Sequence, residues 1–158
     1  MSMVNVEYIN PFIGAAQKLL KDVCQLETKL QKPYLKEAVY EGDVLVIIIG
    51  ITGDIKGQVI LSFNVSTACM IASKMMMGMS VDDLNDMARS AISELSNMIL
   101  GNAATLLSQK GLVIDITPPS VCLGKDINIS VSNSKNICVP LKFDDDSIFE
   151  INISIVEK

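Results

Sequence analysis

The chain of 158 residues contains no histidine. Without an imidazole, neither a Ser-His-Asp triad nor a Cys-His pair can form. Zinc sites built on imidazole are excluded for the same reason. Any catalysis must therefore use carboxylates, carboxamides, hydroxyls or lysine.

Positive charge is also scarce. The chain has 13 Lys and Arg residues against 18 Asp and Glu residues, which gives a net charge of -5 and a pI near 4.6. The sequence has no run of Lys or Arg, whereas binding to nucleic acid or to an anionic membrane calls for a basic patch. We therefore expect neither nucleic acid nor a membrane as the partner.

Long apolar runs and cysteine motifs are missing too. The longest apolar run, Val44–Ile51, is far shorter than the ~20 residues that a membrane helix needs. The four cysteines lie far apart with no C-x-x-C pair, which favours free thiols over disulfides. The first ten residues lack the pattern of a signal peptide. These features predict a cytoplasmic protein.

The pattern of apolar residues predicts a single α+β domain over residues 1–158. A mostly antiparallel sheet should pack against a long central helix and two further helices. Asn10 is placed to cap the first helix, with Pro11 in its first turn. Ser80 and Asp83 resemble a capping box at the start of the long helix. The predicted helices are Pro11–Leu26, Ser66–Gly78 and Ser80–Gln109.

Strands should occupy most of the remaining chain, because apolar and polar residues alternate there. Glycines at 50, 53 and 57 suit a hairpin. A phosphate-binding loop would need a following helix and a Gly-Lys-Ser/Thr ending, and this segment has neither, so the hairpin is favoured. The three acidic residues at 144–146 indicate a hairpin loop rather than a metal site. The predicted strands are Tyr34–Tyr40, Asp43–Ile51, Gln58–Phe63, Leu112–Ile116, Ser120–Leu123, Ile127–Ser132, Ile137–Phe143 and Ile148–Val156.

The long helix has two contrasting faces on a helical wheel. One face is apolar and suited to a core: Ala88, Ile92, Leu95, Ile99, Ala103 and Leu106. The other face carries one acid and one amide among small residues: Ser90, Glu94, Asn97, Gly101, Ala104 and Ser108. The small residues leave room for a bulky group to approach this face. The alternative is that Glu94 and Asn97 are two solvated residues without a function.

The pattern Ser90-x3-Glu94-x2-Asn97, followed by Pro118-Pro119, resembles the signature of the CheC/CheX/FliY phosphatases of bacterial chemotaxis. Two further segments, Gly50–Gly57 and Asp115–Val121, are similar to the hairpin and the post-helix segment of that family. The resemblance spans nearly the whole chain. The length and the opening segment Tyr8–Ile13 are more similar to CheX than to the longer, two-site CheC.

The resemblance implies hydrolysis of the aspartyl phosphate on the response regulator CheY. An acyl phosphate already has a good leaving group, so positioning a water in line and stabilising charge should suffice. Asn97, inserted into the acidic pocket of the partner, would orient that water, because a carboxamide both donates and accepts hydrogen bonds. Glu94 would pair with the active-site lysine of the regulator. The protein would need no metal or cofactor of its own, and Mg²⁺ would belong to the regulator.

The small residues Ser90, Gly101 and Ala104 would let the regulator approach the helix closely. The resemblance also implies a homodimer joined through sheet edges. Two other functions stay open on the sequence alone. One is a non-catalytic module, related to flagellar switch proteins, that binds a phosphorylated regulator, and the other is a scaffold that only dimerises.

A second Glu-x-x-Asn pair occurs at Glu7 and Asn10, with Pro33 at a comparable distance. Gly14 follows Asn10 as Gly101 follows Asn97, which indicates an internal repeat. Proline disfavours helical geometry in the residue before it. We therefore expect Pro11 to leave Asn10 as a cap and this pair to be inactive.

Overall fold

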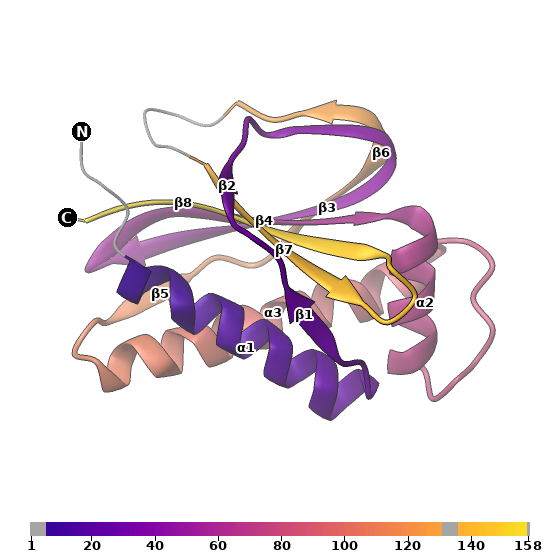
Figure 1. Ribbon diagram of the computed structural model, residues 1–158, viewed down its shortest axis with the longest axis horizontal. Helices are drawn as coiled ribbons and strands as arrows, with labels where there is room; N and C mark the ends of the chain where they lie inside the picture. Colours follow the sequence, from indigo (N-terminus) through magenta and orange to yellow (C-terminus); the bar gives the residue numbers. More distant parts are fainter. Residues whose placement is uncertain (1–5, 131–135, 158) are drawn as a thin grey trace.

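The computed structural model describes residues 6–130 and 136–157. Within these residues, three helices lie against one face of an eight-stranded antiparallel sheet (Figure 1). The predicted α+β class, with a long helix and two further helices, is therefore confirmed. The helices are α1 (Val6–Cys24), α2 (Val65–Met75) and α3 (Asp86–Gln109). The strands are β1 (Thr28–Leu30), β2 (Tyr34–Leu35), β3 (Val39–Gly53), β4 (Ile55–Asn64), β5 (Ile114–Ile116), β6 (Ser120–Asn128), β7 (Ile137–Phe143) and β8 (Ile148–Glu157).

The sheet is built from two similar halves of the chain. Its order is β1-β7-β8-β4-β3-β5, with β2 also on β7 and β6 also on β3. Each half contains a helix, two edge strands and a long hairpin, and α2 lies between the two halves along the chain. The edge strand β1 of the first half pairs with β7 of the second, and β5 of the second half pairs with β3 of the first. The halves complete each other's sheet, in agreement with the internal repeat indicated by the sequence.

The main core lies between the helices and the sheet, and β3 shows how it is filled. Leu45, Ile47 and Ile49 point to the helices and are fully buried. Val46 lies on the opposite face, in a second cluster with Tyr40. A strand that is buried on both faces is apolar along its length, which explains the run at Val44–Ile51. Each helix that the structure describes is too short or too polar to cross a membrane.

The glycine-rich segment forms the predicted hairpin between β3 and β4. Gly53 has φ +113, and a Cβ there would lie 2.5 Å from the Val113 carbonyl oxygen, so only glycine fits. The next residue, Asp54, fastens this turn to Val113, in the segment between α3 and β5. Its backbone N–H donates to Val113 O at 3.0 Å, and Val113 N–H donates to Asp54 Oδ2 at 2.7 Å.

The predicted start of the first helix is wrong. The helix α1 already includes Val6 and continues through Pro11, so Asn10 is helical and is not a cap. A proline removes the hydrogen bond to the carbonyl four residues earlier, here that of Glu7. Ile9 and Phe12 are buried in the main core on either side of Pro11. Their burial outweighs the loss of one hydrogen bond near the helix end.

The other two helices also begin at different residues than predicted. The long helix α3 begins at Asp86 and not at Ser80, because Asn85 caps it and accepts from Ala88 N–H at 2.9 Å. Asn64 caps α2 in the same way. Asparagine is as good a cap as serine, and the sequence offered both.

Three strand predictions need correction. The segment 28–32, which lies between the predicted first helix and the first predicted strand, contains the strand β1. The predicted strand Tyr34–Tyr40 is reduced to the two residues of β2, and Tyr40 belongs to β3. The strands predicted at Ser120–Leu123 and Ile127–Ser132 are joined in β6, which ends at Asn128. Residues 131–132 of the second lie outside the described residues.

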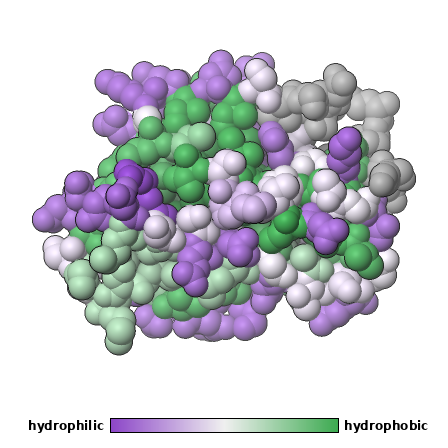
Figure 2. All heavy atoms as spheres, turned by 180° about the vertical axis from the view of Figure 1, so that it is seen from behind, coloured by the Kyte–Doolittle hydropathy of each residue, from purple (hydrophilic) through white to green (hydrophobic). Residues whose placement is uncertain are grey.

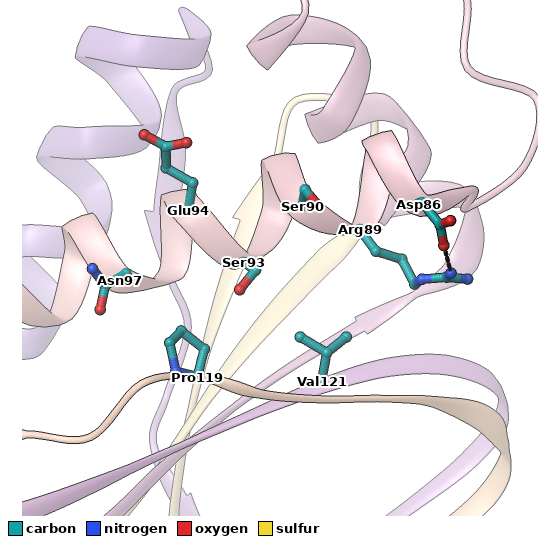
Figure 3. A pocket seen from close by; sticks show the side chains of 8 residues that line it. All are labelled: Asp86, Arg89, Ser90, Ser93, Glu94, Asn97, Pro119 and Val121. Atoms are coloured by element: carbon teal, nitrogen blue, oxygen red, sulfur yellow. Dashed lines mark hydrogen bonds and ion pairs between the residues drawn. The ribbon is translucent and has the colours of Figure 1, made fainter.

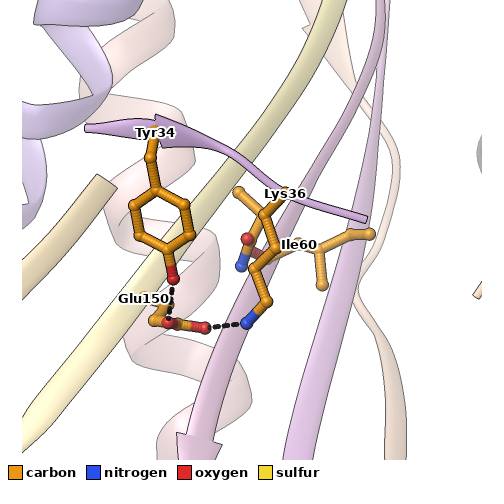
Figure 4. Close-up of polar contacts among 5 residues, drawn as sticks. Tyr34, Lys36, Ile60 and Glu150 are labelled. Atoms are coloured by element: carbon orange, nitrogen blue, oxygen red, sulfur yellow. Dashed lines mark hydrogen bonds and ion pairs between the residues drawn. The ribbon is translucent and has the colours of Figure 1, made fainter. Parts of the chain in front are cut away.

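A polar cluster fastens β2 and the residue after it to the face of the sheet opposite the helices (Figure 4). Lys36 Nζ lies 2.7 Å from Glu150 Oε1, and the Tyr34 hydroxyl donates to Glu150 Oε2 at 3.2 Å. About four-fifths of the surface of each side chain of the ion pair is buried. The chain between β2 and β3 is thereby held across β8.

We predict that the protein loses stability in alkaline solution. Burial raises the pKa of the Cys24 thiol from its ordinary value of 9.0 to about 11, and burial with the charge of Glu150 raises that of Cys138 to about 12. Burial also raises the pKa of Tyr34 and Tyr40. The unfolded chain deprotonates first. The stabilisation is therefore complete below pH 9 and is lost as the pH rises toward 12.

Urea unfolding at pH 7, 9, 10 and 11 measures this loss. The matched variant Cys24→Ala should show a shallower decline than the wild type, because one of the titrating thiols is gone. Equal free energies of unfolding at pH 7 and pH 11 would contradict the prediction.

Candidate functional site

The helix α3 is fixed by its buried face, which leaves the opposite face accessible. The buried residues are Ala88, Ile92, Leu95, Ser96, Ile99, Leu100, Ala103 and Leu107. Ser90, Glu94 and Asn97 are exposed, whereas Gly101 and Ala104 are half-buried. The division into two faces is as predicted, except that Leu107 rather than Leu106 is fully buried. Asn97 is thus available to a partner.

A groove runs between α3 and the first residues of β6 (Figure 3). Its volume is about 600 Å³, and it is open to solvent. It is lined by Asp86, Arg89, Ser90, Ser93, Glu94, Asn97, Pro119 and Val121. Three of the five predicted site residues therefore lie together in it, while Gly101 and Ala104 lie farther along the helix and are not among the lining residues.

Glu94 and Asn97 are one helical turn apart, about 4.5 Å along the axis. In Figure 3 the Glu94 carboxylate points away from the strand, whereas Ser93 points toward Pro119. A partner that covers this part of α3 can contact Glu94 and Asn97 at the same time. The pair offers one negative charge and one carboxamide that both donates and accepts.

The strand side of the groove is held in place by Thr117. Gly50 N–H donates to Thr117 Oγ1 at 2.8 Å, and Thr117 N–H donates to Gly50 O at 3.0 Å. A Cβ at Gly50 would lie 3.1 Å from Thr117 Cγ2, so glycine permits this close approach. The turn that carries Pro119 is therefore tied to β3 at a defined position opposite α3.

Sequence reasoning missed three polar residues of the groove, Asp86, Arg89 and Ser93. Ser93 lies within 40° of Asn97 on a wheel of 100° per residue, so the wheel could have shown it. Arg89 is the single arginine of the chain, which composition could have shown. Its guanidinium donates to the Leu84 carbonyl at 2.9 Å and pairs with Asp86.

Within the described residues, no group of three or more His, Cys, Asp or Glu side chains is placed to hold a metal ion. The predicted hairpin loop at 144–146 joins β7 to β8, and Asp145 accepts from the Ser147 backbone N–H at 3.0 Å. The hydrogen bond from the Ser147 hydroxyl lowers the pKa of Asp145, and the hydrogen bond from the Ser147 backbone N–H lowers it further.

A family model described as chemotaxis phosphatase CheX matches residues 45–142. The chain is also 36% identical over 152 residues to the CheY-P phosphatase CheX of Thermotoga maritima, a match that covers 96% of this chain and 97% of the relative. The chain belongs to the CheX family. The suspected resemblance is therefore confirmed.

Solved structures agree with membership of the CheX family. A CheC-like superfamily protein from Shewanella has a TM-score of 0.86 at 30% identity, with 97% of this chain and 99% of that chain covered. The CheX–CheY–BeF3–Mg²⁺ complex from Borrelia burgdorferi has a TM-score of 0.83 at 35% identity, with 97% of this chain and 100% of that chain covered.

The second Glu-x-x-Asn pair differs from our expectation. Glu7 and Asn10 are both exposed within α1, so they share a helical face as Glu94 and Asn97 do. Pro11 therefore does not remove Asn10 from the helix. The inactivity of this pair stays a prediction, but the reason given for it, the loss of helical geometry at Asn10, is wrong.

We predict that a larger residue at Gly101 leaves the fold intact but hinders the docking of a phosphorylated regulator. A Cβ at Gly101 meets nothing within 4 Å, and glycine inside a helix costs about 1 kcal/mol relative to alanine. Gly101→Ala should raise the melting temperature. Gly101→Leu should fold equally well and lower kcat/KM for a phosphorylated regulator by about tenfold or more, because the added side chain hinders close approach.

Gly14→Leu is the matched control, since a Cβ at Gly14 on α1 also meets nothing within 4 Å. It should leave kcat/KM unchanged. Full activity of Gly101→Leu would contradict the docking role of this glycine.

Proposed function

We propose that this protein is a phosphatase that hydrolyses the aspartyl phosphate of a CheY-type response regulator. The observation that carries the proposal is the exposed pair Glu94 and Asn97, on an uninterrupted helix and beside an open groove. Membership of the CheX family supports it. So do the name of the Thermotoga maritima relative and the Borrelia burgdorferi complex with CheY.

The proposed chemistry needs little from this chain. Asn97 enters the pocket of the regulator and orients a water in line with the phosphorus–oxygen bond to the aspartate. The water attacks the phosphorus, the aspartate carboxylate leaves, and inorganic phosphate is released. Because a carboxylate is a good leaving group, no general acid is required. Glu94 pairs with a lysine of the regulator and thereby fixes the depth of insertion.

We propose that Mg²⁺ is held by the regulator and that this chain contributes no cofactor. The Borrelia burgdorferi complex contains Mg²⁺ and beryllofluoride together with CheX and CheY. We also propose a cytoplasmic location. The four cysteines are free thiols, as is typical of a reducing compartment.

We further propose a homodimer joined through the edge of the sheet at β6. Along the described part of the chain, β6 pairs with β3 and with no other strand. Val121 and Leu123 are 39% and 46% exposed, and the side of the molecule seen in Figure 2 carries a broad apolar area. An unpaired strand edge with apolar side chains favours pairing with a second copy.

Light scattering should therefore give about twice the chain mass of 17.1 kDa. Leu123→Lys should give the monomer mass, because a lysine on an edge strand disfavours pairing. A monomer mass for the wild type at micromolar concentration would contradict the dimer.

The phosphatase proposal predicts the behaviour of three variants in the decay of radiolabelled, phosphorylated CheY-type regulator with Mg²⁺. The wild type should accelerate the loss of phosphate. Asn97→Ala should lose about 100-fold or more of that rate, since a misplaced water loses the in-line geometry. Glu94→Ala should lower kcat/KM by about tenfold or more through the lost charge-assisted contact.

Asn10→Ala is the matched control, because Asn10 has the same type and the same spacing to a glutamate. It should retain the wild-type rate. A loss equal to that of Asn97→Ala would overturn the assignment of the site to α3. Binding of the regulator without faster decay would instead support the non-catalytic module.

A further inference from the structure

The single arginine of the chain stands at one end of the groove. The other twelve cationic residues are lysines, and none of those that the structure describes lines this groove. Figure 3 shows Arg89 above Val121, at the end of α3 where Asp86 begins the helix. Arginine differs from lysine in its planar fork, which binds a carboxylate through two parallel hydrogen bonds.

The guanidinium of Arg89 is held in place, but only some of its N–H groups have a partner. One nitrogen, Nη1, donates to the Leu84 carbonyl at 2.9 Å, and Nη2 pairs with Asp86. The Asp86 side chain is 97% exposed, so this ion pair is weak and screened by water. These are the two partners that the described residues give Arg89, and a guanidinium has five N–H donors. The remaining donors are available to a group outside this chain.

The position of Arg89 excludes contact with the phosphoryl group when Asn97 is inserted. The two residues are eight positions apart on α3, which is about 12 Å along the axis. An arginine that is anchored at Leu84 cannot span that distance. Its target therefore lies on the rim of the partner, outside the phosphorylation pocket.

We propose that Arg89 is a docking residue that pairs with an exposed Asp or Glu on the surface of the phosphorylated regulator. This inference rests on the proposed function and deepens it. The ion pair fixes how the regulator is oriented along α3, while Glu94 and Asn97 act at the phosphate. Val121 lies on the strand side of the groove near Arg89 and brings no competing charge to it.

The test measures kcat and KM for the dephosphorylation of a CheY-type regulator by the full-length protein. Arg89→Gln should raise KM about tenfold and leave kcat unchanged, and Arg89→Glu should raise KM further. Arg89→Lys should recover part of the loss, since it keeps the charge but not the fork. Raising the ionic strength should increase the KM of the wild type more steeply than that of Arg89→Gln.

Lys110→Glu is the control for net charge. It makes the same charge change as Arg89→Glu at the C-cap of the same helix, outside the groove, and should leave KM unchanged. Melting temperatures of all variants separate docking from a role in capping α3, because a purely structural arginine would change the melting temperature without changing the salt dependence.

Three results would overturn the docking role. They are an unchanged KM in Arg89→Gln, a kcat loss like that of Asn97→Ala, and equal salt dependence in the wild type and Arg89→Gln. Failure of the underlying function is distinguishable, since the wild type itself would then not accelerate the loss of phosphate.

Discussion

The burial of one face of α3 against the sheet is the constraint on which the rest of the structure depends. Ile92, Leu95 and Ile99 are almost completely buried, so the helix cannot rotate about its axis without exposing them. The opposite face is thereby turned outward. A polar pair whose direction is fixed by core packing needs no hydrogen-bond network of its own to hold it.

The groove beside α3 depends on contacts between segments far apart in the sequence. Thr117 is tied to Gly50 and Asp54 to Val113, so the strand side of the groove keeps its place relative to the helix. The chain presents a carboxylate and a carboxamide at an open surface, and encloses neither. This arrangement suits a macromolecular partner that brings the reactive group with it, and it explains why a protein without histidine can serve this chemistry.

Much of this could be predicted from the sequence because the signals are local. The apolar period of α3 and the alternation in β3 and β8 identify the elements and the exposed face of the site helix. The failures have a common cause in tertiary contacts. The polar segment of β1 is a strand because β7 pairs with it, and α1 passes through Pro11 because its neighbours are buried. The groove itself follows from the placement of the start of β6 opposite α3, which no local pattern reveals.

The exchange of edge strands between the two halves has a consequence for the history of such a fold. Two copies of one half could satisfy each other by the same exchange, with their hairpins side by side at the centre of the sheet. The topology is therefore that of a fused pair of half-length chains. In such a fusion α1 and α3 are both needed to cover the core, but only one of them has to keep the polar side chains of its exposed face. The exposed residues of α1 are free to diverge while its buried ones are not.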